Sequence, residues 1–327
     1  MNNEVLLSIR DLEVVYTSGG AVIHAVNGVS FEVKRGKTLG LVGETGAGKT
    51  TIAKAIMRIL PDPPAKILKG EIEYDGQDLL KLPEKDMRAI RGKGISMIFQ
   101  DPMTAVNPLF TVGDQIAEVI SLHDKSLSKK DAMNQAMDML KMVGIPPERY
   151  NEYPHQFSGG MKQRVVIAMA LACNPALLLA DEPTTALDVT IQAQVLNMIS
   201  NLQKQLNTSM ILITHDMGIV AENCDEVAVI YAGEIVEFGS KEDIFLHPTH
   251  PYTLGLFGAI PSMTGDVDRL SPIPGMPPDP ENLPEGCHFS PRCAHCTEKC
   301  CSGEIPYVEV SPNHFVRCHL CSGKKEA

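Results

Sequence analysis

Residues 38–50 read TLGLVGETGAGKT, and this stretch decides the fold. Residues 38–42 form an apolar run that predicts a buried strand, and the residues after position 50 place apolar side chains at helical spacing. Between strand and helix lies the pattern G-x-x-x-x-G-K-[ST], which is typical of a P-loop. Its residues are Gly43, Glu44, Thr45, Gly46, Ala47, Gly48, Lys49 and Thr50.

The chemistry of this loop points to a nucleoside triphosphate. Glycines let consecutive backbone N–H groups curl round a phosphate, and the following helix N-terminus adds positive partial charge. In such a loop, Lys49 reaches the β- and γ-phosphates and the Thr50 hydroxyl binds Mg²⁺. We therefore expect ATP-type ligands together with Mg²⁺.

Length and composition set further limits. The chain has 327 residues, enough for one large domain and a smaller one, and 44% of them are hydrophobic. No apolar run approaches the roughly 20 residues that span a bilayer, and the N-terminus lacks a signal-peptide pattern, so we expect a soluble, cytoplasmic chain. A net charge of −11 argues against a dedicated nucleic-acid binder.

Further strands and helices surround the loop. Residues 6–16 and 22–33 alternate apolar and polar and predict two antiparallel strands, with Tyr16 placed to stack on a purine; residues 71–82 predict another strand and turn. Residues 112–143 carry apolar side chains at helical spacing, which predicts a helical subdomain inserted into the core.

Polar residues at the ends of other elements complete the candidate site. Asp181 and Glu182 follow the apolar run 176–180, where carboxylates suit Mg²⁺ binding and activation of water. His215 follows the strand expected at 210–213, and ligand sites gather at such strand ends. Ser158, Gly159 and Gly160 open a predicted helix and form a second anion-binding end.

With these motifs in this order, the chain resembles the ATP-binding subunits of ABC transporters from about residue 4 to 260. The resemblance implies that Tyr16 stacks on adenine, that residues 43–50 are Walker A with Thr51 beside it, and that Ser158, Gly159 and Gly160 bind nucleotide as the signature motif. That motif has Phe157 and Met161 where leucine and glutamine are usual. The fold implied is α/β, a P-loop NTPase core with an antiparallel β subdomain and a helical subdomain at about 101–172.

The same resemblance assigns catalytic roles. Gln100 is the Q-loop glutamine that contacts Mg²⁺ or water, Asp181 is the Walker B aspartate on Mg²⁺, and Glu182 is the general base. Residues 185–188 resemble the D-loop, and His215 the switch histidine that contacts the γ-phosphate. Two such domains are expected to close head to tail around two ATP molecules.

After residue 260 the composition changes. Seven prolines in 261–285 predict a stiff extended linker, and seven of the nine cysteines lie in 287–321. Such crowding in a cytoplasmic chain indicates a metal or cluster site rather than unrelated thiols. The pairs Cys293/Cys296 and Cys318/Cys321 have the spacing of a structural zinc site.

A second resemblance favours a different group from zinc at these cysteines. Residues 247–253, 273–275 and 286–293 resemble the C-terminal extension of oligopeptide/dipeptide importer ATPases. The recurring cysteines of that family match Cys287, Cys293, Cys300 and Cys318, and the resemblance implies a [4Fe–4S] cluster in a small irregular extension. His288 and His295 are interpreted as surface histidines.

These observations predict an ABC ATP-binding domain at 1–260 and a linker with a cysteine-rich extension at 261–327. The expected activity is ATP hydrolysis that powers import of di- or oligopeptides at the cytoplasmic face of the membrane. Expected partners are a second homologous ATPase, two permease subunits and, indirectly, an extracytoplasmic peptide-binding protein. The alternatives are a soluble repair-type ABC ATPase with a zinc module, which acts on nucleic acid, and an ABC translation factor; both usually carry tandem ATPase units, and this chain has one.

Overall fold

The computed structural model describes residues 4–185, 188–258 and 272–321, and these group into two compact units. The P-loop unit comprises residues 7–32, 39–74 and those from 214 onward. The helical unit comprises the residues up to Leu6, 33–38 and 75–213. No helix in the described ranges is long and apolar enough to cross a membrane.

An antiparallel sheet in the P-loop unit follows the alternation predicted for the N-terminal residues. Its strands are β1 (Val5–Ser18), β2 (Ala21–Lys34) and β4 (Ala65–Tyr74), in the order β2-β1-β4. The β1–β4 register pairs Leu7 with Tyr74 and Tyr16 with Ala65. The strand expected from residue 71 thus starts six residues earlier, at Ala65. It begins directly after Pro64, the last of three prolines between positions 61 and 64.

The P-loop strand belongs to a second group of strands in the same unit. β3 (Thr38–Val42) is buried along its whole length and pairs in parallel with β9 (Glu226–Tyr231). β9 continues through antiparallel pairs to β10 (Glu234–Ser240), β12 (His314–Arg317) and β11 (Tyr307–Ser311). The extension is therefore not wholly irregular, as the sequence suggested, because β11 and β12 add regular strands to this group.

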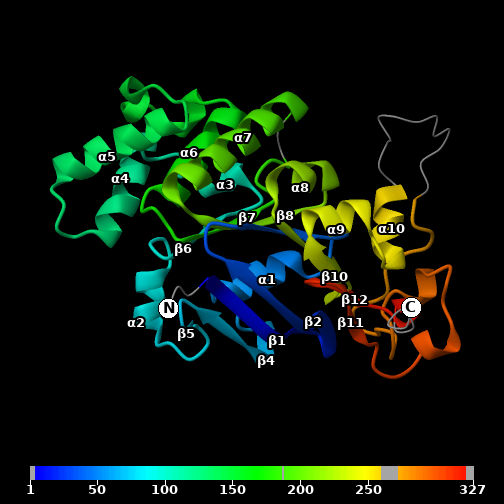
Figure 1. Cartoon of the computed structure of the whole chain (residues 1–327). Coiled ribbons are helices and arrows are strands. Elements are labelled where there is room, and N and C mark those ends of the chain that lie inside the picture. Colours follow the sequence, from blue (N-terminus) through cyan, green and yellow to red (C-terminus); the bar gives the residue numbers. More distant parts are fainter. Residues whose placement is uncertain (1–3, 186–187, 259–271, 322–327) are drawn as a thin grey trace. The chain divides into compact units, whose positions relative to one another are not determined.

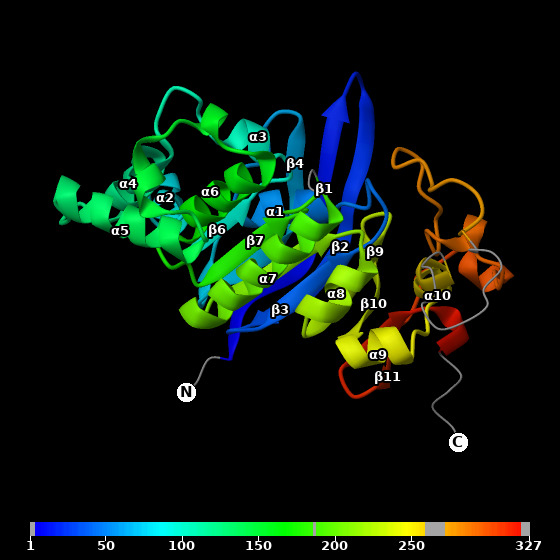
Figure 2. The same cartoon turned by 90° about the horizontal axis from the view of Figure 1, so that it is seen from above.

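Short helices complete the P-loop unit. They are α1 (Lys49–Ile56), α8 (Met217–Asn223), α9 (Lys241–Leu246), α10 (Pro251–Gly258) and the 3₁₀ turns η3 (Ser290–Arg292), η4 (Glu298–Cys300) and η5 (His319–Cys321). Residues 272–289 contain no helix or strand, as their prolines predict. In Figures 1 and 2 the orange and red C-terminal segment lies beside α10.

The helical unit contains a parallel β-layer. β6 (Ile95–Ile98), β7 (Leu177–Asp181) and β8 (Ser209–Thr214) pair in parallel with every residue buried, as expected for strands covered on both faces. The unit also contains β5 (Gln77–Asp78), α2 (Glu84–Ile90), α3 (Pro102–Ala105), η1 (Pro147–Asn151), η2 (Pro154–Gln156), α6 (Gly159–Leu171) and α7 (Val189–Leu206).

Two helices follow the apolar spacing of residues 112–143. α4 (Val112–His123) and α5 (Lys129–Met142) lie side by side in Figure 1. Each helix contributes fully buried apolar side chains, Ile116 from α4 and Leu140 from α5, and each such residue stabilises the unit by about 1.5–3 kcal/mol. Thr111 and Ser128 cap the helices by accepting hydrogen bonds from backbone N–H groups.

Candidate nucleotide-binding and cysteine sites

Two glycines of the P-loop occupy positions that no other residue fits. Gly43 has φ 152°, and a Cβ there would lie 2.1 Å from the Ile230 carbonyl oxygen. Gly48 has φ 98°, and its Cβ would lie 2.2 Å from the Ala25 carbonyl oxygen. A Cβ atom at either position would collide with a backbone carbonyl oxygen, which cannot move aside as a flexible side chain can. Both glycines are therefore required by the close approach of the backbone as well as by the turn.

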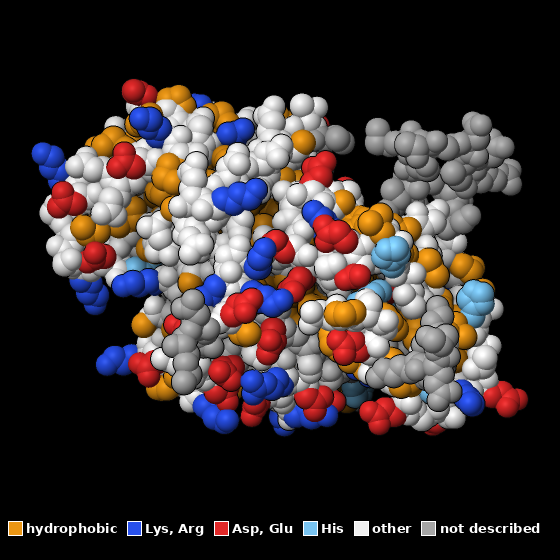
Figure 3. Space-filling view, viewed as in Figure 1, with side chains coloured by type: hydrophobic (Ala, Val, Ile, Leu, Met, Phe, Trp, Pro, Cys, Tyr) orange, Lys and Arg blue, Asp and Glu red, His pale blue; other side chains and the backbone are white. Residues whose placement is uncertain are grey.

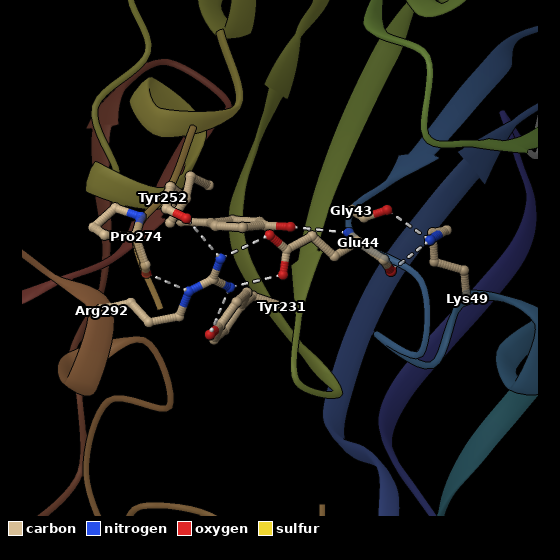
Figure 4. A network of polar contacts seen from close by, with 8 residues as sticks. Gly43, Glu44, Lys49, Tyr231, Tyr252, Pro274 and Arg292 are labelled. Atoms are coloured by element: carbon tan, nitrogen blue, oxygen red, sulfur yellow. Dashed lines mark hydrogen bonds and ion pairs between the residues drawn. The ribbon is translucent and has the colours of Figure 1, made fainter. Parts of the chain in front are cut away.

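Lys49 begins α1 and is 6% exposed. Its Nζ donates hydrogen bonds to the carbonyl oxygens of Gly43 at 2.7 Å and Glu44 at 2.9 Å, which Figure 4 shows. The ammonium therefore lies within the loop whose N–H groups are suited to a phosphate. This is the location predicted for a group that binds the β- and γ-phosphates.

Two other predicted residues belong to the P-loop unit. The Tyr16 hydroxyl lies 3.3 Å from the Thr51 hydroxyl, which brings the expected adenine contact next to α1. His215 is exposed and follows β8, immediately before Asp216, the residue that caps α8. The structure thus brings Tyr16 to the P-loop helix and places His215 at a strand end.

The helical unit contains the acidic part of the candidate site. Gln100 Nε2 donates to Glu182 Oε2 at 3.0 Å, and the Thr185 hydroxyl donates to the same oxygen at 2.9 Å. Asp181 ends β7 and is 2% exposed, while Glu182 leaves the strand with φ 46°. Gln100 and Glu182, which are distant in sequence, therefore meet. Residues 186–187 of the predicted D-loop lie outside the described ranges.

The signature serine caps the N-terminus of α6. Ser158 Oγ accepts a hydrogen bond from the Met161 N–H at 3.4 Å, so Ser158 is the N-cap of a 13-residue helix. One residue of this motif has a contact that the sequence did not reveal. Gln163 is fully buried and its Nε2 donates to the carbonyl oxygen of Pro183, directly after Glu182. Motif membership was the only sequence signal for this link between the signature helix and the Glu182 loop.

Two residues outside the P-loop hold Glu44, and sequence reasoning assigned neither a role (Figure 4). The Glu44 N–H donates to the Tyr252 hydroxyl at 2.9 Å. Arg292 donates to both carboxylate oxygens of Glu44, at 2.7 and 3.1 Å. This pairing raises the pKa of Arg292, and burial raises the pKa of Tyr252, so the guanidinium stays charged and the phenol neutral.

Four cysteines line one pocket of the P-loop unit. They are Cys287, Cys293, Cys300 and Cys318, the four that the importer resemblance selected. Cys296 is exposed and its Sγ lies 3.9 Å from that of Cys301. Burial raises the pKa of the Cys287 thiol to about 12. Among the described residues, no group of three or more His, Cys, Asp or Glu side chains is arranged to hold a metal ion.

The two histidines near these cysteines, His288 and His295, differ in their exposure to solvent. His295 is exposed, as predicted. His288 is 9% exposed and its Nδ1 lies 3.0 Å from the Ala232 carbonyl oxygen, so its interpretation as a surface residue was wrong. The chain turns at residues 287–289 and packs against the loop between β9 and β10, which no local pattern encodes.

Comparisons with known proteins show the class of this chain. The family model described as ABC transporter matches residues 26–185, and the model described as the oligopeptide/dipeptide transporter C-terminal region matches residues 236–300. A solved ATP-binding cassette, a dimer in a post-hydrolysis state bound to ADP and Pi, is 26% identical with a TM-score of 0.65; the match covers 72% of this chain and 99% of that one. Fold and P-loop thus define an ABC-type ATPase.

Curated relatives refine this class. The oligopeptide transport ATP-binding protein OppD of Bacillus subtilis is 50% identical over 96% of this chain and 88% of its own length. The dipeptide transport ATP-binding protein DppD of the same organism is 49% identical over 99% of this chain and 97% of its own length. OppD of Escherichia coli is 45% identical over 96% of this chain. The chain belongs to the ATP-binding proteins of the oligopeptide/dipeptide ABC transporter family.

Proposed function

We propose that this chain binds and hydrolyses ATP to power the import of di- or oligopeptides across the cytoplasmic membrane. The observation that carries the proposal is the buried Lys49 inside a glycine-constrained P-loop, in a chain whose residues 236–300 match the peptide-transporter extension. The nucleic-acid alternatives receive no support from the relatives described above.

The proposed residue roles are those that the family resemblance implies. Residues 43–50 would cradle the phosphates, and Thr50, Asp181 and Gln100 would hold Mg²⁺. Tyr16 and Thr51 would contact the nucleoside. Glu182 takes the proton of the attacking water, and its hydrogen bonds to Gln100 and Thr185 support an oriented carboxylate. His215 contacts the γ-phosphate, and Ser158, Gly159 and Gly160 bind the nucleotide of a second subunit.

The proposed partners are a second homologous ATPase, two permease subunits and, indirectly, a peptide-binding protein outside the membrane. A dimeric solved relative supports the ATPase pair. The chain would then act at the cytoplasmic face, held there by the permease subunits. Surface charge does not favour a nucleic-acid partner: Lys69 pairs with Asp11 and Glu13, and acidic and basic side chains are interspersed on the face drawn in Figure 3.

ATP turnover in a reconstituted transporter tests the proposal. We expect the chain, assembled with its permeases in liposomes, to hydrolyse ATP faster when a peptide-loaded binding protein is added, and Lys49→Ala to abolish this stimulation. The control adds the same binding protein without peptide. ATP hydrolysis that responds to DNA and not to the loaded binding protein would refute peptide import.

The cysteine pocket is proposed to hold a [4Fe–4S] cluster through Cys287, Cys293, Cys300 and Cys318. Four thiols facing one pocket supply the ligand number that such a cluster needs. The pocket that these cysteines line together with eight other residues has a volume of about 10 Å³, room for one water molecule, so the thiols would have to move apart for a cluster to bind. All four lie in turns or at element ends, where such movement costs least. When bound, the cluster would crosslink these turns and stabilise the extension.

Metal analysis distinguishes a [4Fe–4S] cluster from a zinc ion. On protein purified without oxygen, we expect about four iron and four sulfide per chain, the number in such a cluster, and their loss in Cys300→Ser. Cys296→Ser is the matched control, since Cys296 lies outside the pocket. One zinc per chain, lost in Cys296→Ser, would instead assign the two C-x-x-C pairs and refute the cluster.

A further inference from the structure

The C-terminal extension holds one residue of the P-loop at several atoms (Figure 4). Glu44 donates its N–H to Tyr252, accepts Lys49 at its carbonyl oxygen and receives two hydrogen bonds from Arg292 at its carboxylate. Every polar atom of this residue therefore has a partner. Two of the three partners, Tyr252 and Arg292, come from residues beyond 250.

Arg292 is itself fixed by its surroundings. Its side chain is 5% exposed, its Nε donates to the Pro274 carbonyl oxygen at 3.1 Å, and its guanidinium carbon lies 5.7 Å from the centre of the Tyr231 ring. Tyr231 packs at 4.6 Å from Tyr252 and at 5.1 Å from Phe289, ring centre to ring centre. The arginine cannot leave Glu44 without disrupting a buried aromatic cluster.

Charge gives this contact a role in nucleotide binding. The Glu44 backbone belongs to a loop whose proposed ligand carries three to four negative charges, while its carboxylate points away from Lys49 toward Arg292 (Figure 4). At an effective dielectric constant near 20, a unit charge about 10 Å from another still changes binding more than tenfold. The bidentate guanidinium neutralises that carboxylate and fixes the side chain. A lysine could supply the charge but not the two-point contact.

We propose that Arg292 is a positioning residue that neutralises Glu44 and so sets the affinity of the P-loop for ATP. The extension thereby contributes to the nucleotide site through a side chain that never touches the nucleotide. The inference rests on the proposed binding of ATP at residues 43–50. If Arg292 acts in this way, ATP binding depends on the C-terminal segment, which lies outside the residues 26–185 matched by the ABC transporter family model.

Nucleotide titration of the full-length chain tests the inference. We expect Arg292→Ala to raise the Kd for ATP about tenfold and Arg292→Lys to raise it about threefold, because charge is kept and geometry lost. The double variant Glu44→Gln/Arg292→Ala should return to within about threefold of the wild type, since no uncompensated carboxylate remains. A purely structural arginine would show no such rescue.

Arg317→Ala is the matched control. Arg317 also precedes a pocket cysteine, Cys318, and lies over an aromatic ring, that of Tyr307 at 5.4 Å, but it contacts no P-loop residue in the described chain. We expect its Kd for ATP to match the wild type. Wild-type affinity in Arg292→Ala, or a double variant as weak as Arg292→Ala, would overturn the inference. Failure of the wild-type chain to bind ATP would instead overturn the proposed function.

Discussion

Glu237 is the buried carboxylate on which the start of the extension depends. It is fully buried in β10 and accepts hydrogen bonds from the Thr249 N–H at 2.8 Å, the His250 N–H at 3.0 Å and His314 Nε2 at 2.8 Å. Glu237→Ala leaves three donors without their acceptor, two of them on the buried residues His250 and His314 and one on the half-buried Thr249. Each unsatisfied donor costs about 1–3 kcal/mol, so the free energy of unfolding should fall by about 4 kcal/mol.

Urea unfolding followed by circular dichroism, together with amide exchange at Thr249 and His250, measures this loss. Glu237→Gln keeps one acceptor oxygen and should cost about half as much. Glu309→Ala is the control, because Glu309 is exposed and accepts a single hydrogen bond from the Asn313 N–H, so its loss should cost less than about 1 kcal/mol. A Glu237→Ala chain within 1 kcal/mol of the wild type, with unchanged exchange at both amides, would refute the reasoning.

Three further predictions concern catalysis, binding and pH. Glu182→Gln should keep ATP binding and lower the hydrolysis rate by about 10²–10⁴-fold, the range for loss of a general base; near-normal turnover contradicts the role. Lys49→Ala should abolish tight ATP binding in equilibrium titration, and an unchanged Kd contradicts the P-loop assignment. Burial lowers the pKa of His250 from its ordinary 6.5 to about 4, so its neutral form stabilises the fold above pH 6.5. That contribution, about 3 kcal/mol at most, should be lost as the pH falls from 6.5 to 4, and the pH dependence of unfolding should be flatter in His250→Gln.

Motifs that act through local chain geometry were readable in the sequence. The P-loop lies between a fully buried β3 and α1, as residues 38–60 predicted, because strand, glycine turn and helix are each encoded within a few residues. The importer family was identified on the same grounds, from residues 247–253, 273–275 and 286–293. The spacing of apolar residues within 112–143 likewise predicted the helices α4 and α5.

Sequence reasoning went wrong where burial depends on distant segments. His288 was interpreted as a surface residue but packs against Ala232, 56 residues away. The extension was expected to be irregular, yet β12 pairs with β10. Neither outcome is encoded locally, since a histidine in a turn and a short four-residue strand have no periodic signal of their own.

By itself, then, the sequence determined the family of this protein and the candidate residues for its chemistry, because P-loop, carboxylates and cysteines are recognised by residue type and spacing. The tertiary structure alone decided which of these residues act on one another. Arg292 and Glu44 are 248 residues apart, and Gln100 and Glu182 are 82 apart. Pairings over such separations depend on how the strands associate, and that association is set by the burial of many apolar side chains together rather than by any single motif.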